Sequence, residues 1–277
     1  MDTSTTPSTT ESSHHQLPSP KDAGRLLVNL RASMAHHELV EGKQLTPLIA
    51  TLSAWQSLRL SRTHADMLMD PQFGQACAFF LDDIYAPKDF TQRDYDGHRV
   101  YHFMNRFLPE ATLHPLAMAL EVNSLTQQLD LALAEAMRTH LGVADRFERW
   151  QYEEAYRLCD NYDVRARQID LIVDVGHQLE RVRRVSFVYT TLRLARGPAL
   201  RFGWDQMQDF LERGFDAWRS LREPGIFLQR IGQRERAILN RIYGQPGGAP
   251  ESNPFLVSDG GPVEIVLPAS MLQTLGI

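Results

Sequence analysis

Histidine and carboxylate residues recur at helical spacing in three parts of the sequence, in a pattern that could hold a metal. His98 and His102 are four residues apart, which places both imidazoles on one face of a helix. Asp174 and His177 are three residues apart, and Glu121 lies within a long apolar segment. Facing carboxylates and histidines are the ligands of di-iron and di-manganese sites in helical bundles. If these helices meet, the five residues predict a site for iron, manganese or zinc.

The ligand pattern of such a site is incomplete in this sequence. Di-metal bundles typically carry two Glu-x-x-His pairs, whereas a single Asp-x-x-His pair takes that place here. A helical chain with ten histidines also produces such pairs by chance. We therefore expect no resident cofactor, and a metal-dependent, oxidase-like enzyme built inside a bundle remains the alternative.

The densest basic cluster consists of Arg181, Arg183 and Arg184, at the start of an arginine-rich region. Between residues 181 and 241 the chain carries 13 arginines and six acidic residues. Arginine suits bidentate pairing with phosphates and carboxylates. The cluster therefore predicts an anion-binding surface for a phosphorylated ligand. The alternative is a solvated helix face that pairs with the acidic first half of the same chain.

Motifs for nucleophilic or nucleotide chemistry are absent from the sequence. It contains no G-x-S-x-G, no G-x-G-x-x-G and no phosphate-binding loop of the P-loop type. Cys77 lies within an apolar stripe, where a thiol is usually unreactive. Without a complete catalytic constellation, the sequence favours a protein that acts by binding.

The elements that must position these residues are helical. Apolar residues recur every three or four positions along most of the chain, which predicts eight or nine helices. We expect long helical segments at about 111–141 and 145–182, and a helix at 185–196 that Gly197-Pro198 ends. Residues 204–221 follow the cleanest heptad spacing, which predicts a seam in the core.

Three regions follow from this pattern. Residues 1–20 are rich in Ser, Thr and Pro and are expected to form a disordered tail. Residues 21–243 form a single helical bundle domain, and residues 244–277 form a Pro/Gly-rich tail with one candidate short strand at 263–267. The predicted fold class is therefore an all-α multi-helix bundle.

Composition limits the class of protein. The 277 residues carry a formal net charge of −5, which argues against a general nucleic-acid binder. No apolar run reaches the ~18 residues of a membrane-spanning helix. The start of the chain lacks the basic and apolar regions of a secretory signal, and two cysteines cannot build a disulfide framework. We expect a soluble, cytoplasmic protein that binds neither membranes nor nucleic acids.

One segment carries a family resemblance. Residues 79–96 read FFLDDIYAPKDFTQRDYD, and residues 121–137 read EVNSLTQQLDLALAEAM. Over about residues 21–240 the chain resembles an uncharacterised bacterial family with an FFLxxxYGPxDFxxRDxD-like signature, although Ala86 replaces the glycine of that signature. The resemblance implies an all-helical fold and no established activity.

Members of that family are sometimes labelled orotate phosphoribosyltransferases, and the residues test this label. Such an enzyme needs an apolar strand, two acids and a Thr/Gly-rich loop whose amides hold a phosphate. Asp82 and Asp83 imitate the two acids, but residues 84–89 contain neither glycine nor threonine. The alternation of strands and helices is also missing, so the sequence argues against this activity.

The leading hypothesis is a non-enzymatic helical bundle that binds a protein partner, a second copy of itself or a small ligand. The metal-dependent oxidase-like enzyme is the first alternative. The second alternative is a regulator that binds a phosphorylated ligand through the arginine-rich second half of the chain.

Overall fold

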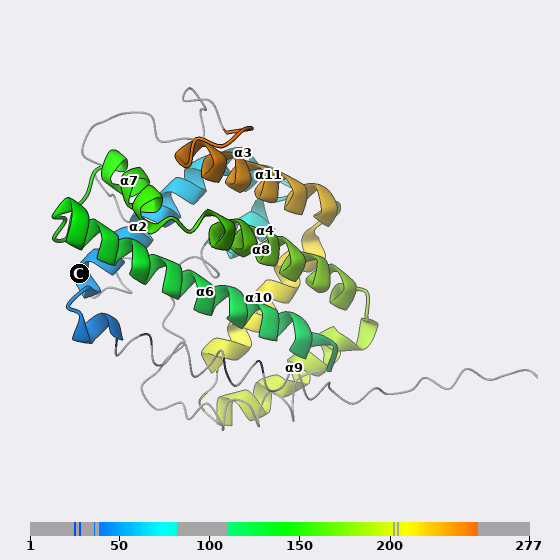
Figure 1. The fold of residues 1–277 in the computed structure, drawn as a ribbon. Helices are drawn as coiled ribbons and strands as arrows, with labels where there is room; N and C mark the ends of the chain where they lie inside the picture. Colours follow the sequence, from blue (N-terminus) through cyan, green and yellow to red (C-terminus); the bar gives the residue numbers. More distant parts are fainter. Residues whose placement is uncertain are drawn as a thin grey trace, which may run out of the picture.

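Helices are the regular elements of this protein. The computed structural model describes Arg25, Val28, His36 and residues 39–81, 110–201, 203 and 205–248, and these residues contain no strand. The helices are α2 (Thr46–Thr63), α3 (Ala65–Leu68), α4 (Gly74–Phe79), α6 (Glu110–Leu141), α7 (Arg149–Cys159), α8 (Tyr162–Arg183), α9 (Ser186–Arg201), α10 (Asp205–Ser220) and α11 (Pro224–Ile242). The predicted all-α multi-helix bundle is therefore confirmed (Figure 1).

Helix α8 connects most of the bundle, because it packs against α6, α9, α10 and α11 (Figure 1). Helices α2 and α7 lie against α6, and α4 lies against α10. Two of the crossings use glycine. A Cβ atom built on Gly176 of α8 would lie 2.2 Å from Leu228 of α11, and one built on Gly214 of α10 would lie 2.6 Å from Phe79 of α4. A larger residue at either position would have to displace the partner side chain.

Of the two long helical segments predicted from the sequence, one is confirmed and the other is wrong. The segment predicted at 111–141 is α6, and Gly142 ends it with a φ of +65°. The segment predicted at 145–182 is instead two helices, α7 and α8. Asp160 separates them in a left-handed conformation, with a φ of 47°. Asp is one of the few non-glycine residues that tolerate this conformation, so no glycine or proline marks the break.

The predicted end of a helix at Gly197-Pro198 is wrong. Helix α9 continues to Arg201 with Pro198 inside it. Proline removes one backbone hydrogen bond, and glycine weakens a helix, so the local sequence disfavours this turn. Packing offsets that cost, because Ala195 and Ala199 on either side of the pair are 3% and 0% exposed.

Three apolar clusters form the core. The first joins α2, α6, α7, α8 and α11, and the second joins α2, α3, α4, α6, α8, α10 and α11. The third joins the start of α6 to α8, α9 and α10. Trp218 and Leu221 of the predicted 204–221 seam are buried, which confirms the seam at these two positions. None of the described helices has the length and apolar character needed to cross a membrane.

Several predictions fall outside the described residues. They concern the tail at 1–20, the candidate strand at 263–267, and the part of the family-like segment from residue 82 onward. His98 and His102 fall in the same undescribed stretch, 82–109.

Candidate functional site

A layer of polar side chains crosses the interior of the bundle between the first and second apolar clusters. On α2, Arg59 lies between Trp55 of the first cluster and Leu60 of the second. On α11, Glu235 lies between Ile231 of the second cluster and Ile238 of the first. We call the following residues the polar layer: Gln56 and Arg59 of α2, Thr126 and Asp130 of α6, Arg165 and Gln168 of α8, and Glu235 of α11.

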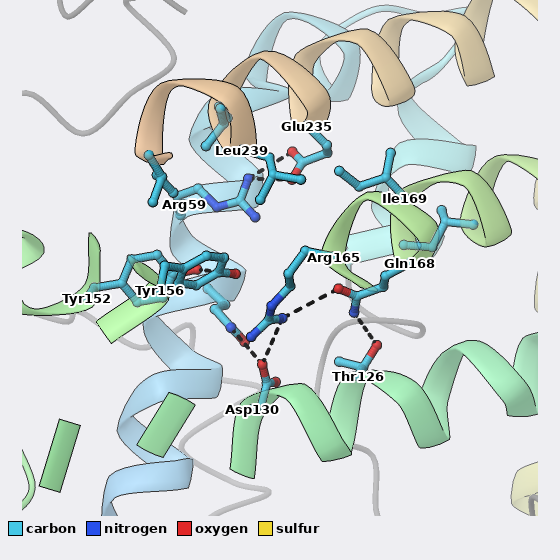
Figure 2. A pocket seen from close by; sticks show the side chains of 14 residues that line it. Arg59, Thr126, Asp130, Tyr152, Tyr156, Arg165, Gln168, Ile169, Glu235 and Leu239 are labelled. Carbon is cyan, nitrogen blue, oxygen red and sulfur yellow. Dashed lines mark hydrogen bonds and ion pairs between the residues drawn. The ribbon is translucent and has the colours of Figure 1, made fainter. Parts of the chain in front are cut away.

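The polar layer lines a cavity of about 50 Å³ (Figure 2). The rest of its wall consists of Tyr152 and Tyr156 of α7, Ile169 and Ile172 of α8, and Ile238, Leu239 and Ile242 of α11. One buried water needs about 10–15 Å³ of such space, so the cavity has room for about three or four waters. A single group of carboxylate size would occupy similar space.

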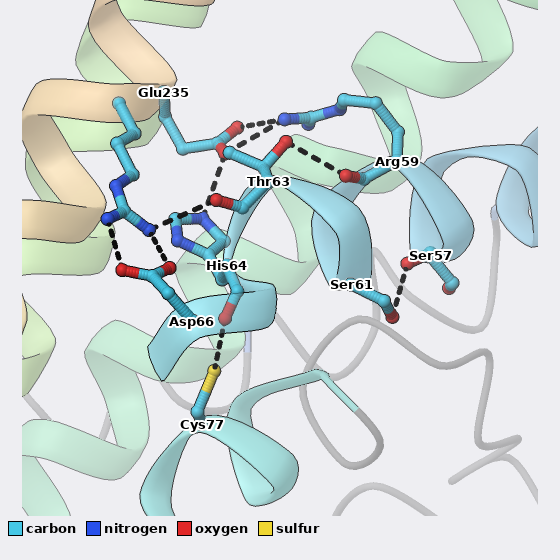
Figure 3. Close-up of polar contacts among 9 residues, drawn as sticks. Ser57, Arg59, Ser61, Thr63, His64, Asp66, Cys77 and Glu235 are labelled. Atoms are coloured by element: carbon cyan, nitrogen blue, oxygen red, sulfur yellow. Dashed lines mark hydrogen bonds and ion pairs between the residues drawn. The ribbon is translucent and has the colours of Figure 1, made fainter. Parts of the chain in front are cut away.

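Arg59 and Glu235 form the tighter of two ion pairs in the polar layer. Nη1 of Arg59 donates to both carboxylate oxygens of Glu235, at 2.8 and 2.6 Å (Figure 3). Both side chains are largely buried, at 12% and 10% exposed. Nε2 of the fully buried His64 lies 3.1 Å from Oε1 of Glu235. These contacts compensate the Glu235 charge within the interior.

The pKa of Glu235 reflects this compensation. Burial alone would raise it, but the Arg59 charge and the hydrogen bonds from His64 and Arg59 lower the pKa of Glu235 to about 2. The carboxylate is therefore ionised at neutral pH, and Arg59 and Glu235 form an ion pair.

Arg165 and Asp130 form the second and looser ion pair. Nη1 of Arg165 lies 3.5 Å from Oδ1 of Asp130 and 3.4 Å from Oε1 of Gln168 (Figure 2). Its closest hydrogen bond runs from Nη2 to the carbonyl oxygen of Leu129, at 3.0 Å. The guanidinium also lies over the ring of Tyr156, 4.5 Å from its centroid. Arg165 is therefore held by its surroundings, but Asp130 compensates its charge only at the limit of hydrogen-bonding distance.

Asp130 differs from Glu235 in the direction of its pKa shift. Burial raises the pKa of Asp130, and the contributions of Arg165 and Gln56 do not fully offset this effect. Gln56 donates to Oδ1 of Asp130 at 3.0 Å. The Asp130 charge is therefore less well stabilised than that of Glu235.

Several N–H and O–H groups around the cavity have no acceptor among the described residues. Nε of Arg165 is buried and has no hydrogen-bond partner among the described residues. Arg59 uses only Nη1 in its contacts with the described residues, which leaves Nε and Nη2 without a partner among them. The Tyr152 hydroxyl donates to that of Tyr156 at 3.0 Å, so the Tyr156 hydroxyl has its own hydrogen to donate. The cavity can therefore receive a group rich in acceptor oxygens.

The candidate metal ligands that lie within the described residues do not converge. Asp174 and His177 are exposed on α8, and Glu121 of α6 forms an ion pair with Arg25. The residues that the structure describes contain no group of three or more His, Cys, Asp or Glu able to hold a metal. Because His98 and His102 lie outside these residues, the metal site stays a prediction.

The arginines of the predicted anion-binding cluster have separate partners. Arg181 donates to Gln178 at 3.4 Å, and Arg184 forms an ion pair with Glu180 at 2.7 Å. Arg183 donates to the carbonyl oxygen of Leu221 at 2.5 Å. The anion-binding surface at this cluster remains a prediction.

Sequence reasoning missed the polar layer, although each charged member leaves a signal. Arg59 follows Leu52 by seven residues and Trp55 by four, so it continues an apolar stripe. Glu235 likewise follows Ile231 by four residues and precedes Ile238 by three. A charged residue at a seam position indicates a buried polar contact or a site.

Comparison with known proteins places the chain in a family. No curated protein and no solved structure matches it. A family pattern matches residues 35–247, which include every residue of the polar layer. This agrees with the expected resemblance to an uncharacterised family. The chain belongs to the family described as a domain of unknown function, DUF8198.

Proposed function

We propose that this protein binds a small ligand with acceptor oxygens, a carboxylate or a small oxyanion, in the cavity of the polar layer. The observation that carries the proposal is the buried Nε of Arg165, which has no hydrogen-bond partner in the described part of the chain although Arg165 lines the cavity. A buried donor without a partner costs about 1–3 kcal/mol. A ligand oxygen that accepts from it would recover this free energy.

The cost of the polar layer supports a binding role. Well-packed apolar side chains in place of buried ion pairs are often neutral or stabilising. The apolar clusters on either side already join the same helices, α2, α6 and α11. The bundle therefore has no evident need for a polar layer at this level, and ligand binding would account for it.

The walls of the cavity suit binding rather than catalysis. Arg165, Arg59 and Tyr156 supply donors from α8, α2 and α7, so a bound oxyanion would be held from three helices. The isoleucines and Leu239 of the wall exclude water and strengthen these hydrogen bonds. The lining residues include no imidazole or thiol, so we propose that the ligand is bound and not transformed.

A thermal-shift series tests the proposal. Formate, acetate, nitrate and phosphate are each added to the full chain, with chloride at equal ionic strength as the reference. A ligand present at 100 times its Kd adds about 2.7 kcal/mol of stability. For a domain of this size that corresponds to a rise in Tm of roughly 5–10 °C. We expect at least one of the four anions to produce such a rise.

Two variants locate the effect. Arg165→Met removes the unpaired donor and is expected to abolish the rise in Tm. Arg184→Met, at an exposed arginine with a surface ion pair, is the matched control and should keep it. If no anion exceeds chloride, or if Arg165→Met responds like the natural protein, the cavity holds water and the polar layer only sets helix register.

A further inference from the structure

Helix α9 carries two seams of residues at spacings of three and four, and the core uses only one of them. Its inner seam consists of Val188, Leu192, Ala195 and Ala199, which are 0–3% exposed. Its outer seam consists of Phe187, Thr190, Leu194, Gly197 and Arg201, which are all exposed. Heptad spacing of this kind is the pattern by which one helix packs on another.

The outer seam exposes large apolar side chains. Phe187, Leu194 and Leu200 are 57%, 72% and 60% exposed. Phe187 and Leu194 are seven residues apart and therefore lie on one line along the helix, whereas Leu200 lies about 120° around the helix from Leu194. Phe187 and Leu194 thus form an exposed apolar line along this face, which is more than a single surface leucine would give.

The outer seam includes one residue without a side chain. Gly197 lies inside α9, one turn before its end, where glycine destabilises a helix relative to alanine. A Cβ atom built on Gly197 would meet nothing within 4 Å, so packing within the protein does not require glycine there. A small residue at this position leaves room for a side chain of a second helix.

The charge of α9 points to an acidic partner. The helix contains three arginines and no Asp or Glu. Arg196 is compensated by Asp209 and Glu212 of α10, at 2.9 and 3.4 Å. Arg193 stacks on Tyr189, and neither Arg193 nor Arg201 forms an ion pair with a described acid. Both flank or join the outer seam and can pair with carboxylates across it.

We propose that the outer seam of α9 docks an amphipathic helix of a partner protein, with apolar residues facing Leu194 and Gly197 and acidic residues facing Arg193 and Arg201. A second copy of α9 would bring arginines against arginines and is disfavoured. A lipid surface would suit a continuous apolar face, whereas Thr190, Gly197 and Arg201 interrupt this one. The proposal is independent of the ligand in the polar layer.

Three labelled helical peptides test the partner chemistry. All have Leu and Ala at the seam positions of three heptads, and the flanking positions are all Glu, all Gln or all Lys. Fluorescence anisotropy measures their binding to the full chain at low and high salt. We expect the Glu peptide to bind, the Gln peptide to bind roughly tenfold more weakly, and the Lys peptide not to bind. High salt should weaken the binding of the Glu peptide.

Variants of the chain locate the docking surface. Leu194→Glu and Gly197→Leu should each weaken binding of the Glu peptide by roughly tenfold or more. Leu158→Glu, at an exposed leucine of α7, is the matched control and should not change it. Circular dichroism checks that each variant stays folded. Equal binding of all three peptides, no binding of any, or binding that Leu194→Glu leaves unchanged would overturn the proposal.

Two further measurements test the other occupants. The first is co-sedimentation of the full chain with vesicles that contain phosphatidylserine. The proposal would be overturned if the chain bound these vesicles, Leu194→Glu abolished this binding, and no peptide bound. Analytical ultracentrifugation would overturn it if the chain formed a dimer that Leu194→Glu dissociated. We expect neither result, and a monomer that binds the Glu peptide supports the acidic helix.

Discussion

Arg59 and Arg165 are both buried in the polar layer, yet they are held in different ways. Arg59 makes two hydrogen bonds of 2.6–2.8 Å to the carboxylate of Glu235. Arg165 contacts Asp130 at 3.5 Å, and its Nε has no partner within the ranges that the structure describes. Within the same layer of the same bundle, one arginine has a close carboxylate partner and the other has only a distant one.

The carboxylates show the same contrast. The pKa of Glu235 is lowered to about 2, whereas burial raises the pKa of Asp130. The matched pair stabilises the contact between α2 and α11, since removing either member leaves an uncompensated buried charge. The mismatched pair leaves hydrogen-bonding groups that a ligand can use. Under the proposed function, Arg59 stabilises the fold through Glu235 and offers its remaining N–H groups to the ligand, whereas Arg165 acts mainly in binding the ligand.

The largest expected effect is on the matched pair. Glu235→Gln leaves the Arg59 charge buried without its carboxylate, and we expect the free energy of unfolding to fall by about 3–5 kcal/mol. Urea denaturation measures this change. Glu180→Gln removes an exposed pair with Arg184 and should cost less than about 1 kcal/mol. Equal effects of the two substitutions would remove the structural assignment of Arg59–Glu235.

Lowering the pH should change the stability contributions of Glu235 and Asp130 in opposite directions. The ordinary pKa of Glu is 4.5, so the Glu235 contribution is complete above about pH 4.5 and is lost as the pH falls toward 2. This loss amounts to about 3 kcal/mol. Asp130 has a raised pKa, so its contribution decreases as the pH rises above its ordinary 3.8.

Unfolding free energies measured between pH 2 and 5 test these signs. Glu235→Gln should flatten the acid-side loss of stability. Asp130→Asn should make that loss steeper, because it removes the opposing contribution. An unchanged acid profile in Glu235→Gln would show that other carboxylates cause the acid-side loss.

Local patterns predicted most of the fold but failed where packing overrides them. The apolar periodicity of 111–141 predicts α6, since a face that repeats over so many turns has few alternatives. Gly197-Pro198 is a strong local stop signal, yet the buried Ala199 keeps α9 helical beyond it. The left-handed turn at Asp160 has only a weak sequence signal, because Asp tolerates this conformation but also occurs within helices.

The candidate site could be predicted only in part. Arg165 precedes Ile169 by four residues and Ile172 by seven, so its place on an apolar face is visible in the sequence. The same holds for Asp130, which precedes Leu133 by three residues and Met137 by seven. That both reach one cavity depends on how α6 and α8 align along their lengths, which local spacing does not fix. A histidine pair spaced by three or four residues predicts a metal site only weakly, because such pairs also arise by chance in a helical chain.

A smaller effect is expected at the mismatched pair. Arg165→Met replaces the guanidinium with an apolar side chain and removes the hydrogen bond to the Leu129 carbonyl oxygen. Because its contact with Asp130 is long, we expect a loss of about 1–3 kcal/mol, below that of Glu235→Gln. Urea denaturation of both variants in one buffer makes the comparison. A loss as large as that of Glu235→Gln would show that Arg165 is also structural.

The smallest effect is expected at the two tyrosine hydroxyls of the cavity. Tyr156→Phe keeps the ring under Arg165 but removes the acceptor of the Tyr152 hydroxyl, and we expect a loss of about 1 kcal/mol. The double variant Tyr152→Phe/Tyr156→Phe removes both partners and should cost no more than the single variant, because no buried hydroxyl is left without a partner. Urea denaturation gives both values.

The same two variants test whether the Tyr156 hydroxyl donates to the ligand. If it does, the anion-induced rise in Tm should decrease in both variants. A full rise in Tm in the double variant would limit the ligand contacts to the two arginines.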